Sequence, residues 1–243
     1  MIELLGVGVP RRNGGWLLHR VCATLEAGEL TTVLSADAEE RRALLDAVAG
    51  RRLPHEGRVW IDRVPVMPES LGRVHRLCGG IDPADGLVPR RSVFWNALAP
   101  ASGPRALGRL LRLPRRRERD AVRGALERVE LQARLDDPVS ALSAFERLRL
   151  VVARALARRP HYLVVRDPDT ALSADEAGAL LGLLRLLARS DRLGVVVSLA
   201  DGASSRGLAD RVLRLHEGVL LSPGRLDAPG RPPAAWRAVA LAR

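Results

Sequence analysis

Two charged groups that could do chemistry stand directly after apolar runs of the kind that form buried strands. Residues 35–43 follow the run Leu30–Leu34, and Arg166 and Asp167 follow the run Tyr162–Val165. A helix that starts after such a strand can bind phosphate through free backbone N–H groups, and arginine can pair with phosphate oxygens. The stretch 35–43 contains no glycine, so its backbone lacks the freedom to curl around a phosphate. It also carries carboxylates that would repel one. These are Asp37, Glu39 and Glu40.

The same stretch fits an ordinary capped helix start better than an anion site. In Asp37-Ala38-Glu39-Glu40, the Asp37 side chain can accept hydrogen bonds from the N–H groups that a phosphate would otherwise satisfy. Ser143-Ala144-Phe145-Glu146 fits a second capping box of the same kind. The sequence therefore predicts two self-capped helix starts.

The elements that must position these groups follow from the alternation of short apolar runs with helical patterns, which predicts a mainly parallel α/β sheet covered by helices. Tyr162–Val165 and Gly194–Leu199 are continuous apolar runs, typical of central parallel strands. Helical patterns cover 38–49, 106–157 and 174–187.

The net charge of +11 is weak evidence for a nucleic-acid partner, because all 39 basic residues are arginine and none is lysine. Arginine of that exclusivity, with abundant alanine, glycine and proline, indicates a compositional bias of the coding sequence. The N-terminus shows no signal-peptide pattern, and no apolar run approaches the ~20 residues that span a bilayer. We expect a cytoplasmic protein whose contact with a membrane is peripheral.

Several segments resemble an ABC (ATP-binding cassette) transporter ATPase in order and spacing, over about residues 1–222. The closest resemblance is to the phosphonate-import type. The resemblance is clearest in the segments LLDAVAG at 44–50, PHEGRV at 54–59, RLVVARALA at 149–157 and ADRVL at 209–213.

The resemblance implies a P-loop NTPase-type sheet, mainly parallel, with an antiparallel β subdomain and an inserted helical subdomain at about 85–150. Residues 223–243 are expected to form a Pro/Gly-rich C-terminal tail.

The resemblance also places the family's nucleotide-binding positions on this chain. The phosphate loop falls on 35–43, where Arg41 takes the lysine slot and Arg42 and Ala43 take the hydroxyl slots. Ser143 remains from the signature motif. The positions carried over are Ser35, Asp37, Glu40, Arg41, Arg42, Ala43 and Ser143.

The remaining motif slots hold residues of the wrong chemistry. Arg166 occupies the slot of the magnesium-orienting Asp, and Asp167 that of the Glu that polarises water, which makes Asp167 the catalytic candidate by position. We expect no metal site. We also hypothesise that Arg166 pairs with Asp37, Glu39 or Glu40 in place of the magnesium–nucleotide link. The other lost slots are Pro83 (glutamine), Phe145 (signature glycine) and Ala200 (switch histidine).

The sequence thus favours a degenerate ABC subunit, a pseudo-ATPase that acts as scaffold or regulator. It is expected to dock on a membrane permease through residues 87–98, from Leu87 to Leu98, at the inner face of the cell membrane. It could also pair with an intact ABC ATPase. ATP and magnesium are the family's cofactors, but none is expected here.

Two other functions stay open. One is an active ATP-hydrolysing subunit that uses Arg41 and Asp167 in unusual roles. The other is a repurposed Arg-rich binding module, although a nucleic-acid ligand is not expected. Its arginines would be Arg105, Arg109, Arg112 and 115–117. The transported substrate is not encoded in a subunit of this kind.

Overall fold

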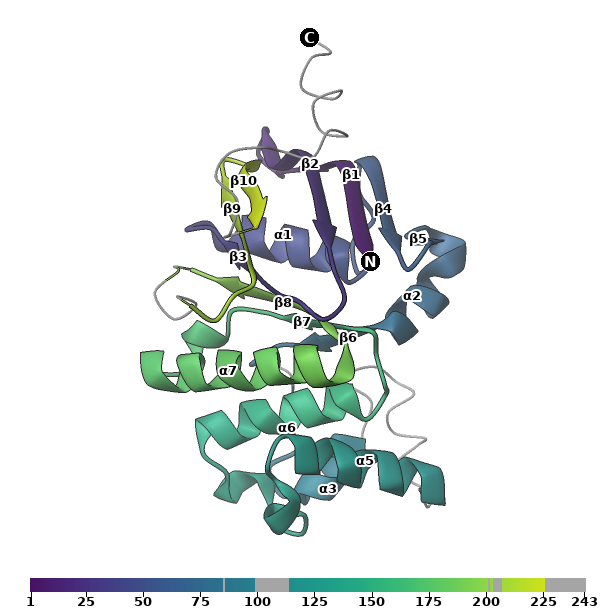
Figure 1. The fold of residues 1–243 in the computed structure, drawn as a ribbon, viewed down its shortest axis with the longest axis vertical. Helices are drawn as coiled ribbons and strands as arrows, with labels where there is room; N and C mark the ends of the chain where they lie inside the picture. Colours follow the sequence, from purple (N-terminus) through teal and green to yellow (C-terminus); the bar gives the residue numbers. More distant parts are fainter. Residues whose placement is uncertain (85, 99–113, 201, 203–206, 226–243) are drawn as a thin grey trace.

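The computed structural model of the protein describes residues 1–84, 86–98, 114–200, 202 and 207–225 (Figure 1). They form two sheets with a helix between them and a further group of helices on the outer face of the larger sheet. The described helices are α1 (Ala38–Val48), α2 (Leu71–Leu77), α3 (Val93–Leu98), α5 (Arg116–Arg128), α6 (Ala144–Leu156) and α7 (Ala174–Asp191). Short 3-10 helices cover Pro68–Ser70, Gln132–Arg134, Val139–Ala141 and Pro168–Thr170.

The smaller sheet is antiparallel and has the strand order β2-β1-β4-β5. Strands β1 and β2 shift register at several points, as expected of a twisted, bulged pair. Its strands are β1 (Ile2–Pro10), β2 (Trp16–Leu25), β4 (Glu56–Ile61) and β5 (Val64–Pro65).

The larger sheet has the strand order β10-β9-β3-β8-β7-β6 and is parallel except for the β9–β10 hairpin. Its central strands are buried along their whole length, which explains their continuous apolar sequences. Its strands are β3 (Leu30–Leu34), β6 (Cys78–Ile81), β7 (Tyr162–Val165), β8 (Gly194–Leu199), β9 (Arg211–His216) and β10 (Val219–Arg225).

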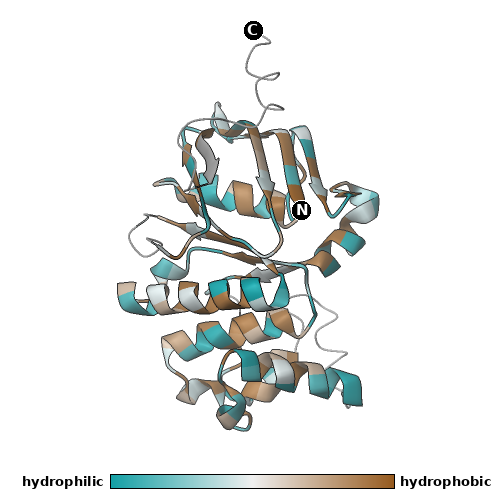
Figure 2. Ribbon diagram, in the orientation of Figure 1, coloured by the Kyte–Doolittle hydropathy of each residue, from teal (hydrophilic) through white to brown (hydrophobic). Residues whose placement is uncertain are grey.

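Two hydrophobic clusters hold these layers together. One joins α1 to the antiparallel sheet and to the facing side of the central strands, through residues such as Leu44, Val33 and Val196. The other joins the opposite side of the central strands to α7, α6, α5 and α3. Figure 2 shows hydrophobic residues along the strands of both sheets and mixed faces on the helices. This arrangement confirms the predicted α/β class, with its parallel core, antiparallel subdomain and helical subdomain.

Part of the sequence-based expectations falls outside the described residues. Arg105, Arg109 and Arg112 lie there, as does the expected tail from 226 onwards, whereas strand β10 runs to Arg225. The boundaries 1–222 and 85–150 therefore stay predictions. Among the helices that the structure describes, none is both long and apolar enough to cross a membrane.

Candidate functional site

The candidate site lies where β3, β7 and β8 end, next to the start of α1. Parallel pairing aligns these strands, with Val33 beside Ser198 and Val165 beside Val197. Their carboxyl ends therefore meet at one edge of the sheet, the usual place for ligands in such folds. Residues 35–41, Arg166 and Asp167 all follow these ends, so the structure brings the two predicted charged groups together.

The backbone N–H groups at the start of α1 donate to acceptors within the same segment. Asp37 is the N-cap, and its Oδ1 accepts hydrogen bonds from the N–H groups of Glu39 (2.7 Å) and Glu40 (3.4 Å). The N–H of Asp37 itself donates to Ser35 Oγ at 3.0 Å, and that of Arg41 donates to the Asp37 carbonyl at 3.2 Å. The predicted cap is confirmed, and these donors are no longer directed at a ligand.

Glu40 does not complete the predicted capping box. Its side chain turns inward, where Oε2 accepts from Ser35 Oγ at 2.8 Å and Oε1 accepts from the Gly218 N–H at 2.8 Å. The residue is only 2% exposed. A buried carboxylate needs such donors, and Gly218 in the β9–β10 turn supplies one. Glu40 thus ties the loop after β3 to the closing hairpin.

Arg41 is buried and paired with the positional catalytic residue. It is 4% exposed, its Nε lies 2.7 Å from Asp167 Oδ1, and its Nη1 donates to the Ser35 carbonyl at 2.6 Å. Asp167 also accepts from Ser198 Oγ at 2.6 Å, and its own N–H donates to that oxygen at 3.0 Å. Asp167 has φ of 37°, in the left-handed region. Arg41, predicted to take the lysine slot, and Asp167, predicted to take the water-polarising slot, therefore neutralise each other's charge inside the fold.

Arg11 adds a cation on the outer side of the α1 start. Its guanidinium lies 2.6 Å from Asp37 Oδ2 and 3.1 Å from Glu39 Oε2. The hydrogen bond from Arg11 and the backbone bonds of the cap outweigh burial and lower the pKa of Asp37 below its ordinary value of 3.8. The acidic residues that would repel a triphosphate are thus balanced by a protein cation.

The prediction that Arg166 pairs with Asp37, Glu39 or Glu40 is wrong. Its guanidinium pairs with Asp46 at 2.5 Å and with Asp82 at 2.8 Å, instead of with Asp37, Glu39 or Glu40. The reason is the sheet register, because Ile81 lies beside Val165, so the next residues, Asp82 and Arg166, follow adjacent strand ends. Asp46 lies in the last turn of α1. A cation with two carboxylates now fills the expected magnesium slot.

The signature segment shows the second predicted cap. Ser143 is the N-cap of α6, and Ser143 and Glu146 form the reciprocal capping box, with bonds of 2.8 and 3.1 Å. Glu146 also pairs with Arg134 at 2.9 Å. Arg149 stacks 5.3 Å from the ring centroid of Phe145, in the lost glycine slot. This helix start, too, is closed by the protein's own side chains.

The remaining motif positions contribute packing or surface. Ala43 is 1% exposed in the core, whereas the Arg42 side chain is 67% exposed and pairs with Asp46 at 3.7 Å. Pro83 lies in the turn after β6. The N–H of Ala200 donates to Asp169 Oδ2 at 3.0 Å. Among the residues that the structure describes, no cluster of three or more His, Cys, Asp or Glu side chains could hold a metal ion.

Sequence reasoning missed three residues that hold this site together: Ser198, Asp46 and Asp82. Ser198 is the polar residue in the otherwise apolar run of β8, a signal that could have been used. Asp82 follows directly after β6, but only the strand order shows which charge it meets.

Comparison with known proteins decides the family. The sequence profile described as "ABC transporter" matches residues 18–170. The chain belongs to the ABC transporter family. It is 30% identical over 224 residues to the phosphonates import ATP-binding protein PhnC 1 of Trichodesmium erythraeum, covering 91% of this chain and 88% of the relative. It is 28% identical to PhnC 2 of Cupriavidus metallidurans, covering 93% and 82%.

Solved ABC cassettes share the fold at lower identity. The cbiO1 structure from Clostridium perfringens, part of the ABC transporter complex cbiONQ, has a TM-score of 0.79 at 19% identity over 91% of this chain and 86% of that one. An ATP-binding cassette in its ADP conformation has a TM-score of 0.81 at 16% identity, covering 93% and 91%.

These comparisons correct the expectation that no cofactor is used. The relatives are named ATP-binding proteins, so ATP, with its magnesium ion, is the cofactor that the family implies for this chain.

The residues at the α1 start nevertheless do not fit the phosphates and magnesium in the manner of a P-loop. The N–H groups of residues 37 and 39–41 are used within the loop, Arg41 is bound by Asp167, and Arg166 is bound by two other carboxylates.

Proposed function

We propose that this ABC subunit docks on a membrane permease and does not hydrolyse ATP at its own α1 start. The observation that carries the proposal is the buried ion pair between Arg41 and Asp167. A P-loop cation must face the phosphates, and the catalytic carboxylate must face a water molecule. Here each faces the other at 2.7 Å, so neither is available for hydrolysis.

The family's ATP is then bound where this chain meets a second ABC ATPase whose P-loop is intact. In such a pair the partner supplies the glycines, lysine and magnesium-binding hydroxyl of the P-loop. This chain contributes only the α6 start at Ser143, which its own capping box closes. Ser143 still caps its helix, and Phe145 stands in a glycine slot beside it. The pair is proposed to transmit conformational changes with reduced turnover, as a regulator or scaffold.

The permease contact is proposed to be residues 87–98, a surface loop that leads into helix α3 (Val93–Leu98). Asn96 is 3% exposed and fixes it: its Oδ1 accepts from the Val88 N–H at 2.7 Å, and its Nδ2 donates to the carbonyls of Val88, Arg91 and Ser92. Val88 is 49% exposed, and Arg90 is exposed beside it. A clamped backbone that presents an apolar and a cationic side chain suits docking on a partner.

The proposed location is therefore cytoplasmic, at the inner face of the cell membrane. The named relatives favour an importer of the phosphonate type. Because the permease selects the substrate, this assignment concerns the type of transporter and leaves the transported molecule open.

The proposal is tested by co-purifying the full chain with an ABC importer permease of the same organism and measuring Mg-ATP turnover of the complex. We expect association that is lost when Val88→Asp and Arg90→Glu are combined. Arg119→Glu, a charge reversal on exposed α5, should leave it unchanged. Turnover by this chain alone that disappears in Arg41→Ala would instead support an active ATPase.

A further inference from the structure

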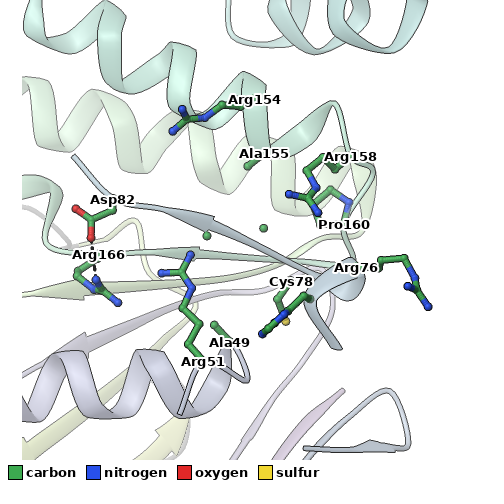
Figure 3. Close-up of a pocket in the computed structure, with 13 residues that line it drawn as sticks. Ala49, Arg51, Arg76, Cys78, Asp82, Arg154, Ala155, Arg158, Pro160 and Arg166 are labelled. Carbon is green, nitrogen blue, oxygen red and sulfur yellow. Dashed lines mark hydrogen bonds and ion pairs between the residues drawn. The ribbon is translucent and has the colours of Figure 1, made fainter. Parts of the chain in front are cut away.

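A second basic site lies near the C-terminal end of α1 and adjoins the candidate site at Arg166 and Asp82. It is a cavity of about 600 Å³ between the end of α1, helix α2, the edge strand β6 and the end of α6 (Figure 3). Since α1 has 11 residues, its ends are about 16 Å apart at 1.5 Å per residue. The volume lies within the range of about 300–1,000 Å³ that small-molecule sites occupy.

The lining of this cavity is strongly cationic. Five arginines and one histidine line it against one carboxylate, Asp82, which is already paired with Arg166 at 2.8 Å. In the described part of the chain, Arg51, Arg76 and Arg158 form no ion pair with a carboxylate. Figure 3 shows Arg51 reaching from the end of α1 toward β6 and Arg158 on the α6 side, whereas Arg76 lies at the outer edge with its guanidinium directed away from them. Positive charge concentrated in a concave site attracts anions.

The backbone of the edge strand makes room for this arrangement. A Cβ at Gly80 would lie 1.6 Å from Arg51 Nη2, so the guanidinium lies directly over a residue without a side chain. A Cβ at Gly79 would lie 3.2 Å from side-chain atoms of Ala155 and Pro160. Any larger pair of residues in β6 would displace Arg51 or fill part of the cavity.

Four of these arginines lie at helix ends, and the fifth, Arg166, already pairs with Asp46 and Asp82. Arg51 follows α1, Arg158 follows α6, and Arg76 and Arg154 lie in the last turns of α2 and α6. A cation near a helix C-terminus contributes about 0.3–1 kcal/mol. The Asp46 carbonyl of α1 already accepts from the N–H groups of Arg51 (2.7 Å) and Arg52 (3.1 Å). A single helix end needs no more than one such cation, whereas here the ends of α1, α2 and α6 bring their arginines around one cavity.

We propose that this cavity binds a small phosphorylated molecule with at least two negative charges. Guanidinium groups match phosphate oxygens with two parallel hydrogen bonds each, and several around one anion suit a dianion better than a single carboxylate. The cavity shares Arg166 and Asp82 with the candidate site, but neither the α1 start nor residues 87–98 line it, so it does not require the proposed permease contact.

The test is calorimetric titration of the full chain with inorganic pyrophosphate at constant ionic strength. We expect one site per chain and binding at least about 10-fold weaker in Arg51→Ala, as removal of a bidentate phosphate contact implies. Gly80→Ala should weaken binding similarly, because its methyl group pushes the Arg51 guanidinium away while every charge is kept. Arg119→Ala removes one exposed charge outside the cavity and should change affinity less than about 2-fold.

Three results would overturn the proposal. Equal weakening in Arg119→Ala would show a general charge effect of an Arg-rich surface. Loss of binding in Arg41→Ala with no change in Arg51→Ala would locate the anion at the α1 start. Binding of an oligoglutamate peptide without binding of pyrophosphate would show a protein-docking surface. Circular dichroism of each variant establishes whether it is folded. If Arg51→Ala does not fold, Gly80→Ala provides a second test of the site.

Discussion

The ion pair between Arg41 and Asp167 makes Arg41 a structural residue, so replacing it should destabilise the protein in the absence of any nucleotide. The two side chains are 5% and 15% exposed. Removing one partner of a buried pair costs about 3–5 kcal/mol, because the other charge is left uncompensated. Asp167 keeps its bond from Ser198 and some contact with solvent, which favours the lower end, about 3 kcal/mol for Arg41→Ala.

In a domain of this size, that loss corresponds to a fall in Tm of about 6–12 °C, at about 2–4 °C per kcal/mol. Urea unfolding of the nucleotide-free protein, followed by circular dichroism, measures it directly. The neighbouring variant Arg42→Ala is the matched control: this side chain is 67% exposed and its ion pair spans 3.7 Å, so the cost should stay below about 0.5 kcal/mol.

A double variant isolates the pair itself. Arg41→Met with Asp167→Asn removes both charges, and the two changes together should cost about 1–3 kcal/mol less than the sum of the single changes. The reasoning is refuted if Arg41→Ala destabilises the nucleotide-free protein by less than about 1 kcal/mol, no more than a surface change would. Such a result would mean that Arg41 is free to serve a ligand.

Three further changes test neighbouring contacts. Asp37→Ala removes the N-cap of α1 and should cost about 1 kcal/mol by urea unfolding, whereas Asp37→Asn should retain most of that. The hydrogen bond from Arg11 lowers the pKa of Asp37 in the folded protein, so the charged Asp37 side chain stabilises the fold at pH values above its ordinary pKa of 3.8. The stability difference between wild type and Asp37→Asn should therefore shrink as pH falls below 3.8, and a difference that stays constant would contradict the assigned role of Arg11. Arg166→Ala leaves Asp82 without its cation and Asp46 with only the exposed Arg42, and it should cost about 1–3 kcal/mol, with Arg166→Lys recovering part; no loss in thermal melts would show these ion pairs to be unimportant. Asn96→Ala removes the clamp of the loop before α3 and should both cost about 2 kcal/mol and speed amide exchange at Val88, while unchanged exchange would argue against the clamp.

The scaffold was predictable because its signals are local. Continuous apolar runs gave β7 and β8, and the spacing of Ser143 and Glu146 gave the start of α6. The Asp37 cap is equally local, since donor and acceptor lie within three residues. Helix capping depends on backbone geometry that neighbouring residues set.

The ion pairs within the site were not predictable in the same way. Arg41 and Asp167 are 126 positions apart, and Arg166 and Asp46 are 120 apart, so only the strand order brings them together. Several carboxylates were available to Arg166, and the choice of Asp82 follows from the pairing of β6 with β7. Glu40 likewise looked like a capping residue but is bound by Gly218, which is distant in sequence.

The most direct test of the account is the steady-state rate of Mg-ATP hydrolysis by the full chain and by Arg41→Ala. An intact ABC ATPase in the same assay serves as the positive control. The account predicts that both proteins remain at the background rate, since Arg41 and Asp167 are bound to each other. A magnesium-dependent rate above background that is abolished by Arg41→Ala, in a variant still folded by circular dichroism, would contradict it.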